Sequence, residues 1–338
     1  MSFAHGFDTP LTRRGAFSTA VAGVGLAAVL GAFPGLIQKA QAAWQPDFND
    51  PKDNLKAFIK LTSDLSGQPI VGWFSGHVFG VVGDDILKPL FGVEGFGTGM
   101  CIAQPDGTYK SSWKEVGLYK DLKTNKVLET WKNPYIDEVV EVVHIQNEAV
   151  NTIQALYYPD FSNMAVLGEA GELRMEFPNY TRADDPTRPF VLPWTVVGDQ
   201  VAVWNDFRGR VKNVLDPKVY VRESTGEYIR VSEFFLNMGS MTLLMDEGIS
   251  SVPSTGAWNR LAPWLPWMFM GRSPGHLFYR ATTQKLAKFE QLPKHILDYA
   301  EKKFPQYLTY DTPWRMPNES SWDVYKKLKR PAPAKAGA

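Results

Sequence analysis

Two histidines in apolar, strand-like stretches are the first candidates for chemistry. His77 shares a strand face with Trp73, and His144 lies near the end of the alternating stretch 139–145. A histidine changes its charge near neutral pH, so it can give or take a proton during a reaction. We therefore predict that His77 and His144 are proton-transfer residues that face one cavity.

Two carboxylates are placed to support these histidines. Glu94 lies among apolar residues, and Glu148 follows His144 after a short polar turn. Burial would raise the pKa of the Glu94 carboxyl and make it a proton donor. The same side chains fit two other interpretations. They are structural residues with hydrogen bonds, or they supply nitrogen and oxygen ligands to a metal.

The segment 258–276 is the most unusual stretch of the sequence, with three tryptophans, two methionines and three prolines. Aromatic side chains line sites for apolar ligands, and arginine binds anionic groups or stacks on rings. The segment predicts an apolar lid or pocket wall, or else a loop that closes the core at one end of a barrel. The predicted substrate-binding residues are Trp73, Trp258, Arg260, Trp264, Trp267, His276 and Tyr279.

Composition excludes several classes of protein. The formal net charge of the 338 residues is zero, which argues against electrostatic binding of nucleic acid. Cys101 is the single cysteine, so an internal disulfide, an iron–sulfur cluster and a cysteine-based zinc site are excluded. We expect a buried, structural thiol. Phosphate-loop, dinucleotide and Gly-x-Ser-x-Gly motifs are absent from the sequence, so we predict no organic cofactor.

The first 42 residues read as a cleaved export signal. Arg13 and Arg14 precede an apolar run, 16–33, and the small-residue site 40–42 predicts cleavage before Ala43. The arginine pair favours the twin-arginine route, which carries folded proteins. We therefore expect the export machinery as a partner, a periplasmic location and no permanent membrane anchor.

Short strands separated by turn residues dominate the rest of the chain. The expected strands are 71–82, 108–121, 127–131, 139–145, 149–156, 201–208, 228–236, 240–245 and 277–281. Glycines threaded through the first of these predict sharp curvature or the close approach of another backbone. The pattern predicts a mainly β, antiparallel, barrel-like (calycin-like) domain, closed or nearly closed. A sandwich of two sheets is the alternative.

Two helices and a tail complete the expected organisation. Apolar spacing predicts a helix over 53–65, with Asp53 as its cap, and another over 293–304. We expect one domain over 43–325 and a disordered basic tail over 326–338.

Several segments together resemble a known family. They are the glycine-rich strand around Trp73, the segment 90–95, and Trp258-x-Arg260 followed by Pro263-Trp264-x-x-Trp267-Met268-x-Met270-Gly271. They are similar to a bacterial and fungal domain family of unknown function whose members often carry twin-arginine signals. The resemblance covers about residues 50–315. It implies one exported domain and transfers no catalytic residue.

These observations leave three functions open. The first is a periplasmic lyase, isomerase or hydrolase that acts on a small apolar, aromatic or polycyclic substrate by acid–base chemistry. The second is a periplasmic carrier for a hydrophobic ligand, with a pocket lined by apolar side chains. The third is a metal-dependent enzyme that uses His77, His144 and a carboxylate.

Overall fold

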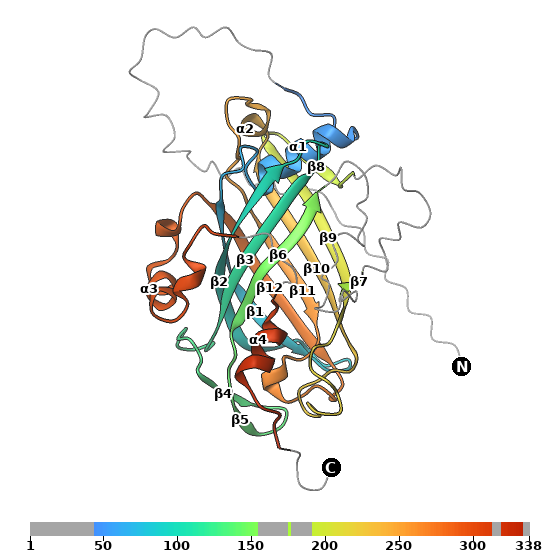
Figure 1. Ribbon diagram of the computed structural model, residues 1–338, viewed down its shortest axis with the longest axis vertical. Coiled ribbons are helices and arrows are strands. Elements are labelled where there is room, and N and C mark those ends of the chain that lie inside the picture. Colours follow the sequence, from blue (N-terminus) through green and yellow to red (C-terminus); the bar gives the residue numbers. More distant parts are fainter. Residues whose placement is uncertain (1–43, 155–174, 177–190, 313–318, 334–338) are drawn as a thin grey trace, which may run out of the picture. The chain divides into compact units, whose positions relative to one another are not determined.

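The computed structural model describes residues 44–154, 175–176, 191–312 and 319–333, and many more of them form β-strands than helices (Figure 1). This confirms the predicted antiparallel β fold. The strands are β1 (Ile70–Val81), β2 (Lys88–Ala103), β3 (Tyr109–Lys120), β4 (Thr130–Asn133), β5 (Glu138–Glu141), β6 (Ile145–Gln154), β7 (Met175–Glu176), β8 (Trp194–Val197), β9 (Gln200–Lys212), β10 (Tyr228–Ser240), β11 (Thr255–Ala262) and β12 (His276–Leu286).

Ten of these strands belong to one antiparallel sheet, in the order β6-β3-β2-β1-β12-β11-β10-β9-β7, with β8 also paired to β9. Strands β4 and β5 form a separate pair. Within the described residues no pairing joins β6 to β7 or β8. The described residues therefore form one large antiparallel sheet without full closure, and the finer prediction of a nearly closed, barrel-like domain or a sandwich is not decided by these pairings.

The helices are short and few. They are α1 (Pro51–Thr62), α2 (Met241–Met245), α3 (Lys294–Lys303) and α4 (Ser321–Leu328), with single 3₁₀ turns at η1 (Pro266–Met268), η2 (Phe289–Gln291) and η3 (Pro305–Tyr307). The two predicted helices are present as α1 and α3. The cap of α1 is Asp50, not Asp53, because the Asp50 side chain accepts from the backbone N–H groups of residues 52 and 53.

Two expectations about local structure need correction. The predicted strand 240–245 is α2, because the Ser240 hydroxyl caps the N–H of Leu243 and starts a helical turn. The predicted tail boundary at residue 326 falls inside α4. That helix is held by a capping box between Ser320 and Asp323.

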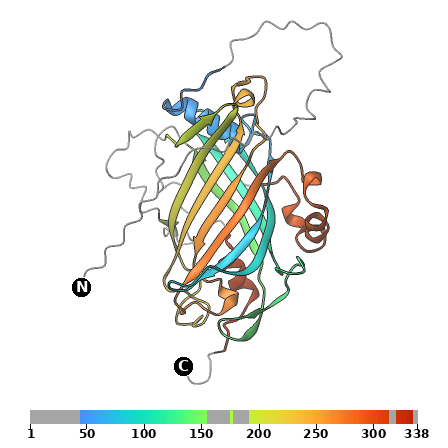
Figure 2. The ribbon, with the colours of Figure 1, turned by 180° about the vertical axis from the view of Figure 1, so that it is seen from behind.

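Side chains of the large sheet alternate between two faces. We call the inner face the side that carries Trp113, Trp258 and Tyr279, and the outer face the side that carries Trp73 and Glu94. In Figure 2, which is turned by 180° from Figure 1, the long strands β9 to β12 lie nearest the viewer. No helix among the described residues is long and apolar enough to cross a membrane.

Glycines open the inner face of β2 between its apolar ends. A Cβ atom on Gly97 or on Gly99 would lie 2.4 Å from the ring of Trp113, and one on Gly72 would lie 2.8 Å from it. Real Cβ atoms do not approach so closely, so these positions accept only glycine without rearrangement. Of the glycines predicted in the first strand, Gly72 makes room for this tryptophan, and Gly76 allows the close approach of the backbone at Arg280, as expected.

The tryptophan-rich segment packs into an apolar core on the inner face. Trp264 and Trp267 are 1% and 2% exposed, and Met268 is fully buried beside them. This cluster also contains Phe91 of β2 and Leu277 of β12. The segment thus closes the core near η1, as the second interpretation of its sequence had it.

Two further apolar clusters fix the helices to the sheet. Leu55 and Leu61 of α1 pack with Cys101 and Val203, and Cys101 is 1% exposed. Ile296 and other residues of α3 pack against the outer face. Burial raises the pKa of the Cys101 thiol to about 12, as expected for a structural cysteine.

The predicted export signal, residues 1–42, lies outside the described residues. The part of the chain that the structure describes belongs to the compact unit Ala43–Ala338.

Candidate functional site

An ion pair on the inner face is the centre of the candidate site. Arg260 of β11 donates from Nη1 to Oε1 of Glu233 on β10, at 2.8 Å. The two residues are direct partners in the β10–β11 register, which brings their side chains together. Trp258 donates from Nε1 to the other carboxylate oxygen at 3.2 Å. Both Glu233 oxygens are therefore engaged by donors from one neighbouring strand.

Two tyrosines extend this cluster. The hydroxyl groups of Tyr119 on β3 and Tyr279 on β12 lie 3.2 Å apart, and both side chains are buried. Strands β3 and β12 are separated by β1 and β2 in the sheet. In a flat sheet they would stand roughly 14 Å apart, so this contact is helped by curvature of the sheet toward its inner face.

Glu115 adds a second carboxyl group to the cluster. It accepts from Nε1 of Trp113 at 3.3 Å and from Nδ2 of Asn147 at 2.6 Å. Glu115 also acts electrostatically on Glu233 and Arg260. The inner face therefore gathers two acids, one guanidinium and two phenols from strands β3, β10, β11 and β12.

The surroundings of Glu233 raise the pKa of its carboxyl above the ordinary value. Burial raises the pKa of its carboxyl, Arg260 offsets part of that effect, and Glu115 adds to it. Burial also opposes the charge on Arg260, but Glu233, the two tyrosines and Glu115 together outweigh it, so the pKa of the arginine rises and the side chain stays charged. Burial likewise raises the pKa of both tyrosines, which keep their hydroxyl hydrogens at neutral pH.

The ion pair is not sealed from water. The side chains of Arg260 and Glu233 are 20% and 13% exposed, although Trp258 and Tyr279 beside them are buried. A charged pair that faces inward and still meets solvent is a place where a small molecule can replace water.

Three of the predicted substrate-binding residues meet in this cluster, namely Trp258, Arg260 and Tyr279. Sequence reasoning missed Glu233 and Glu115. Each is a lone carboxylate in an aromatic, strand-like stretch, which is the signal that had selected Glu94. The same pattern could therefore have selected Glu115 and Glu233 as candidates together with Glu94.

The other predicted ligand contacts lie in different surroundings. Trp264 is a core residue whose Nε1 donates to the carbonyl of Pro274 at 3.2 Å. The Trp267 ring packs on Tyr119 at 5.5 Å, and its Nε1 is buried with no partner among the described residues. His276 is half-buried at the start of β12, opposite Val81.

Glu94 centres a second cluster, on the outer face. Its carboxylate accepts from Nε1 of Trp73 at 3.1 Å, from Nζ of Lys120, and from Nε2 of His295 on α3 at 2.9 Å. Burial acts to raise the pKa of Glu94, but the hydrogen bonds from Lys120 and His295 lower it further than burial raises it. The predicted rise of its pKa is therefore wrong, because the buried carboxylate is paired.

The structure does not bring His77 and His144 together. His77 is exposed on the outer face of β1, in ring contact with Phe79. His144 is 6% exposed and lies between β5 and β6, where Nδ1 accepts from the backbone N–H of Tyr119 at 3.2 Å. Burial lowers the pKa of His144 to about 4, which keeps it neutral.

Glu148 is half-buried on β6, and its backbone bridges to Glu319. The hydrogen bond of His144 thus comes from β3 and not from the carboxylate that follows it in sequence.

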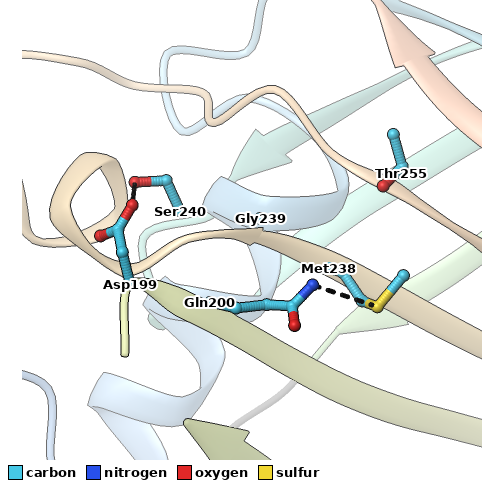
Figure 3. A pocket seen from close by; sticks show the side chains of 6 residues that line it. All are labelled: Asp199, Gln200, Met238, Gly239, Ser240 and Thr255. Atoms are coloured by element: carbon cyan, nitrogen blue, oxygen red, sulfur yellow. Dashed lines mark hydrogen bonds between the residues drawn. The ribbon is translucent and has the colours of Figure 1, made fainter. Parts of the chain in front are cut away.

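A surface pocket lies elsewhere, at the β8–β9 turn and the end of β10 (Figure 3). Asp199 accepts from the Ser240 hydroxyl and from the backbone of Thr242, both at 2.7 Å. Gln200 donates to the Met238 sulfur at 3.7 Å. Asp199 and Ser240 of this pocket hold the start of α2, so these two polar groups are already engaged.

Metal ligands do not gather in the described part of the chain. No group of three or more histidine, cysteine, aspartate or glutamate side chains is placed there to hold an ion.

Comparison with known proteins gives a family and no activity. No curated protein matches the chain. One solved structure, Acinetobacter baumannii OccAB2, is similar over 59% of this chain and 49% of that chain, at 11% identity and a TM-score of 0.15. The chain thus spans about half the length of that protein, and so low a score carries no argument. The model of the family described as "Protein of unknown function (DUF1838)" matches residues 67–329. The chain therefore belongs to the DUF1838 family.

Proposed function

We propose that the inner cluster is the active site of an exported enzyme that acts on a small apolar, aromatic or polycyclic substrate by acid–base chemistry. The observation that carries this proposal is Glu233, an inward-facing carboxyl with a raised pKa that remains in contact with water. A carboxyl whose pKa lies closer to the working pH exchanges protons more effectively than an ordinary one. The reaction class is a lyase, isomerase or hydrolase.

In this proposal Glu233 transfers the proton, and its neighbours orient its carboxyl group and the substrate. Arg260 holds the carboxylate in place and stabilises negative charge that develops nearby. Trp258 fixes the second carboxylate oxygen and offers an apolar surface to the substrate. Glu233 takes over the role that the sequence suggested for the two histidines.

The placement of the histidines supports this reassignment. His77 is exposed on the outer face, away from the aromatic core. His144 stays neutral to about pH 4, and its Nδ1 is already occupied by a backbone donor. Glu94 is saturated by three donors and, with its lowered pKa, is a weak acid catalyst.

We also propose that the sheet is barrel-like, with the cluster inside it. The Tyr119–Tyr279 bond supports this, because it joins strands that are three steps apart. So does the electrostatic influence of Glu115 on Arg260, which acts across four steps. Distances between spin labels on β6 and β9, measured by electron paramagnetic resonance, would test closure. An open, flat sheet predicts a separation several strand widths greater than a barrel-like sheet does.

Export through the twin-arginine route remains part of the proposal and rests on Arg13 and Arg14. Replacing both with lysine should retain the protein in the cytoplasm of its native host. Periplasmic protein in undiminished amount would contradict this route.

A trapping experiment tests the enzyme. The wild type and the Glu233→Gln variant are purified from the native host, and their bound small molecules are identified by mass spectrometry. We expect the variant to hold a substrate that the wild type lacks, and added wild type should convert that molecule. Glu247→Gln is the matched control, since Glu247 pairs with Lys56 at the surface.

A carrier for a hydrophobic ligand is the second candidate, and the aromatic surroundings of the cluster favour it. Phe74 and Tyr279 pack on Trp258 with ring centroids 5.4 and 5.5 Å apart. A carrier would yield the same molecule from wild type and variant, unchanged after incubation with wild type. That outcome would overturn the enzyme and establish the carrier.

A further inference from the structure

We propose that the inner cluster binds a neutral carbonyl compound on an aromatic or polycyclic frame, with its carbonyl oxygen held by Arg260 and by the Tyr119–Tyr279 pair. The inference rests on the proposed function, because it names the substrate class of the same site. It follows from a count of donors, a count of charges and the apolar surface beside them.

Arg260 has more donors than partners. A guanidinium carries five N–H groups. In the part of the chain that the structure describes, Arg260 makes one hydrogen bond, to Glu233. The side chain is 20% exposed, so water can reach part of it in the free protein. A substrate oxygen that replaces this water gains donors that are already in position.

The tyrosine pair has one donor to spare. Tyr119 and Tyr279 both keep their hydroxyl hydrogens, because burial raises the pKa of each. Their mutual bond uses one of the two hydrogens. The second hydrogen has no acceptor among the described residues. A buried donor without an acceptor is costly, so the pair favours a ligand that supplies an oxygen atom.

The charges select a neutral ligand over an anion. Two carboxyl groups, Glu115 and Glu233, act on the one guanidinium of Arg260. A carboxylate or phosphate ligand would bring a further negative charge into a partly desolvated site that has no second cation among its described neighbours. A ketone or a related carbonyl compound accepts the same hydrogen bonds without that charge.

The neighbouring rings fit an aromatic frame. Trp258 is buried against Tyr279 and Phe74, and Trp113 lies over the glycines of β2. Flat apolar surfaces of this kind stack on aromatic ligands. The site thus offers donors at one point and rings around it.

Binding of three matched probes tests the inference. They are 2-acetonaphthone, 2-naphthoate and 2-ethylnaphthalene, which share one ring system and differ in the group it carries. We expect equilibrium dialysis with the wild-type protein at neutral pH to show the ketone binding at least ten-fold more tightly than either of the others. Equal or tighter binding of the carboxylate or the hydrocarbon would overturn the inference, as would no binding of any probe.

Variants assign the preference to the named donors. Arg260→Lys keeps the positive charge but loses the planar set of donors, and Tyr279→Phe removes a hydroxyl. Each should reduce the ketone preference to less than three-fold. Arg280→Lys is the matched control, because Arg280 is exposed on the outer face of the adjoining strand. Unchanged preference in both inner-face variants would contradict the assignment.

The two proposals fail separately. One outcome is a ketone preference together with the same unconverted ligand in wild type and Glu233→Gln. It would overturn the enzyme but keep the carbonyl compound as the class of ligand that is bound. Conversion that depends on Glu233, together with tighter binding of naphthoate, would keep the enzyme and overturn the carbonyl class.

Discussion

Glu94 and Glu233 are two carboxylates held in nearly the same way on opposite faces of one sheet. Each accepts from a tryptophan Nε1, at 3.1 Å from Trp73 and at 3.2 Å from Trp258, and each pairs with a cation. Their pKa values nevertheless move in opposite directions, down for Glu94 and up for Glu233.

The two carboxyls differ in their neighbours and in the balance between burial and pairing. Glu94 has a second basic partner, His295, whereas Glu233 has a second acid nearby, Glu115. Burial acts to raise the pKa of both carboxyls. Lys120, with help from His295, overcomes this effect at Glu94, whereas Arg260 does not overcome it at Glu233, where Glu115 adds to the rise. The outer cluster is thus suited to stability, and the inner cluster to proton transfer.

The largest expected effect is on stability, from Glu94→Gln. The change leaves Lys120 unpaired with 5% of its side chain exposed. Breaking a buried pair in this way costs roughly 3 kcal/mol. Urea denaturation should show that loss, and Glu94→Gln with Lys120→Met should recover part of it. Glu233→Gln should cost less, because water reaches Arg260. Equal losses from Glu94→Gln and Glu233→Gln would break the comparison.

The pH dependence of stability in Glu94→Gln and Glu233→Gln tests the comparison of the two carboxylates further. The contribution of Glu94 is present above its unfolded pKa, near 4.5, and is lost as the pH falls through its lower folded pKa. The contribution of Glu233 has the opposite sign: it is present below 4.5 and lost as the pH rises through its higher folded pKa. The stability difference between wild type and variant should therefore grow with pH for Glu94 and shrink for Glu233.

The next largest expected effect is the loss of stability at acid pH that comes from His144. Its pKa is 6.5 in an exposed chain and about 4 when folded. The unfolded chain therefore binds a proton first, and stability falls by about 3 kcal/mol in total as the pH drops from 6.5 to 4. In His144→Asn the amide oxygen can still accept from Tyr119, and thermal melts should lose this component. An identical acid profile in the variant would show that His144 is solvated.

Alanine substitutions at two glycines of β2 compare the inner face with the outer face, and the expected losses of stability are smaller. Gly97→Ala should lower stability by about 2 kcal/mol, because its Cβ would lie 2.4 Å from the Trp113 ring. The outer-face control, Gly92→Ala, has its nearest neighbour at 3.5 Å and should change stability little. Denaturation midpoints check both. Equal effects would mean that Trp113 yields freely.

The smallest expected effect comes from His295→Gln. The His295 side chain is 56% exposed, and exposed pairs contribute at most about 1 kcal/mol. Carboxyl NMR titration should still find the pKa of Glu94 below its ordinary value, held there by Lys120. A return of that pKa to 4.5 or above would assign the shift to the histidine instead.

The sequence predicted the fold where pattern and propensity agree. Alternating residues and turns located β1, β3 and β10, and apolar spacing located α1 and α3. It missed β2, because glycines at inner positions weaken the alternation, and they are there to admit Trp113. It took β11 for an irregular segment because prolines surround it. The cap at Ser240 outweighed the strand-like composition of α2.

The candidate site was predictable only in part. Trp258, Arg260 and Tyr279 were identified from an unusual composition, but their partners come from distant segments. Pairing of Glu233 with Arg260 depends on the register of β10 and β11, and a one-residue slip would turn Glu233 to the other face. Register depends on the whole sheet, so the single sequence could name candidate carboxylates but not choose among them.

Cys101 gives this protein an internal reporter. Its thiol is 1% exposed beneath α1, and it is the single cysteine of the chain. With a pKa of about 12, the closed state carries almost no thiolate at neutral pH. A thiol reagent can therefore react only after the packing around Cys101, which includes α1, opens. The labelling rate of an unmodified molecule consequently measures how often that end opens, and whether a bound ligand slows it.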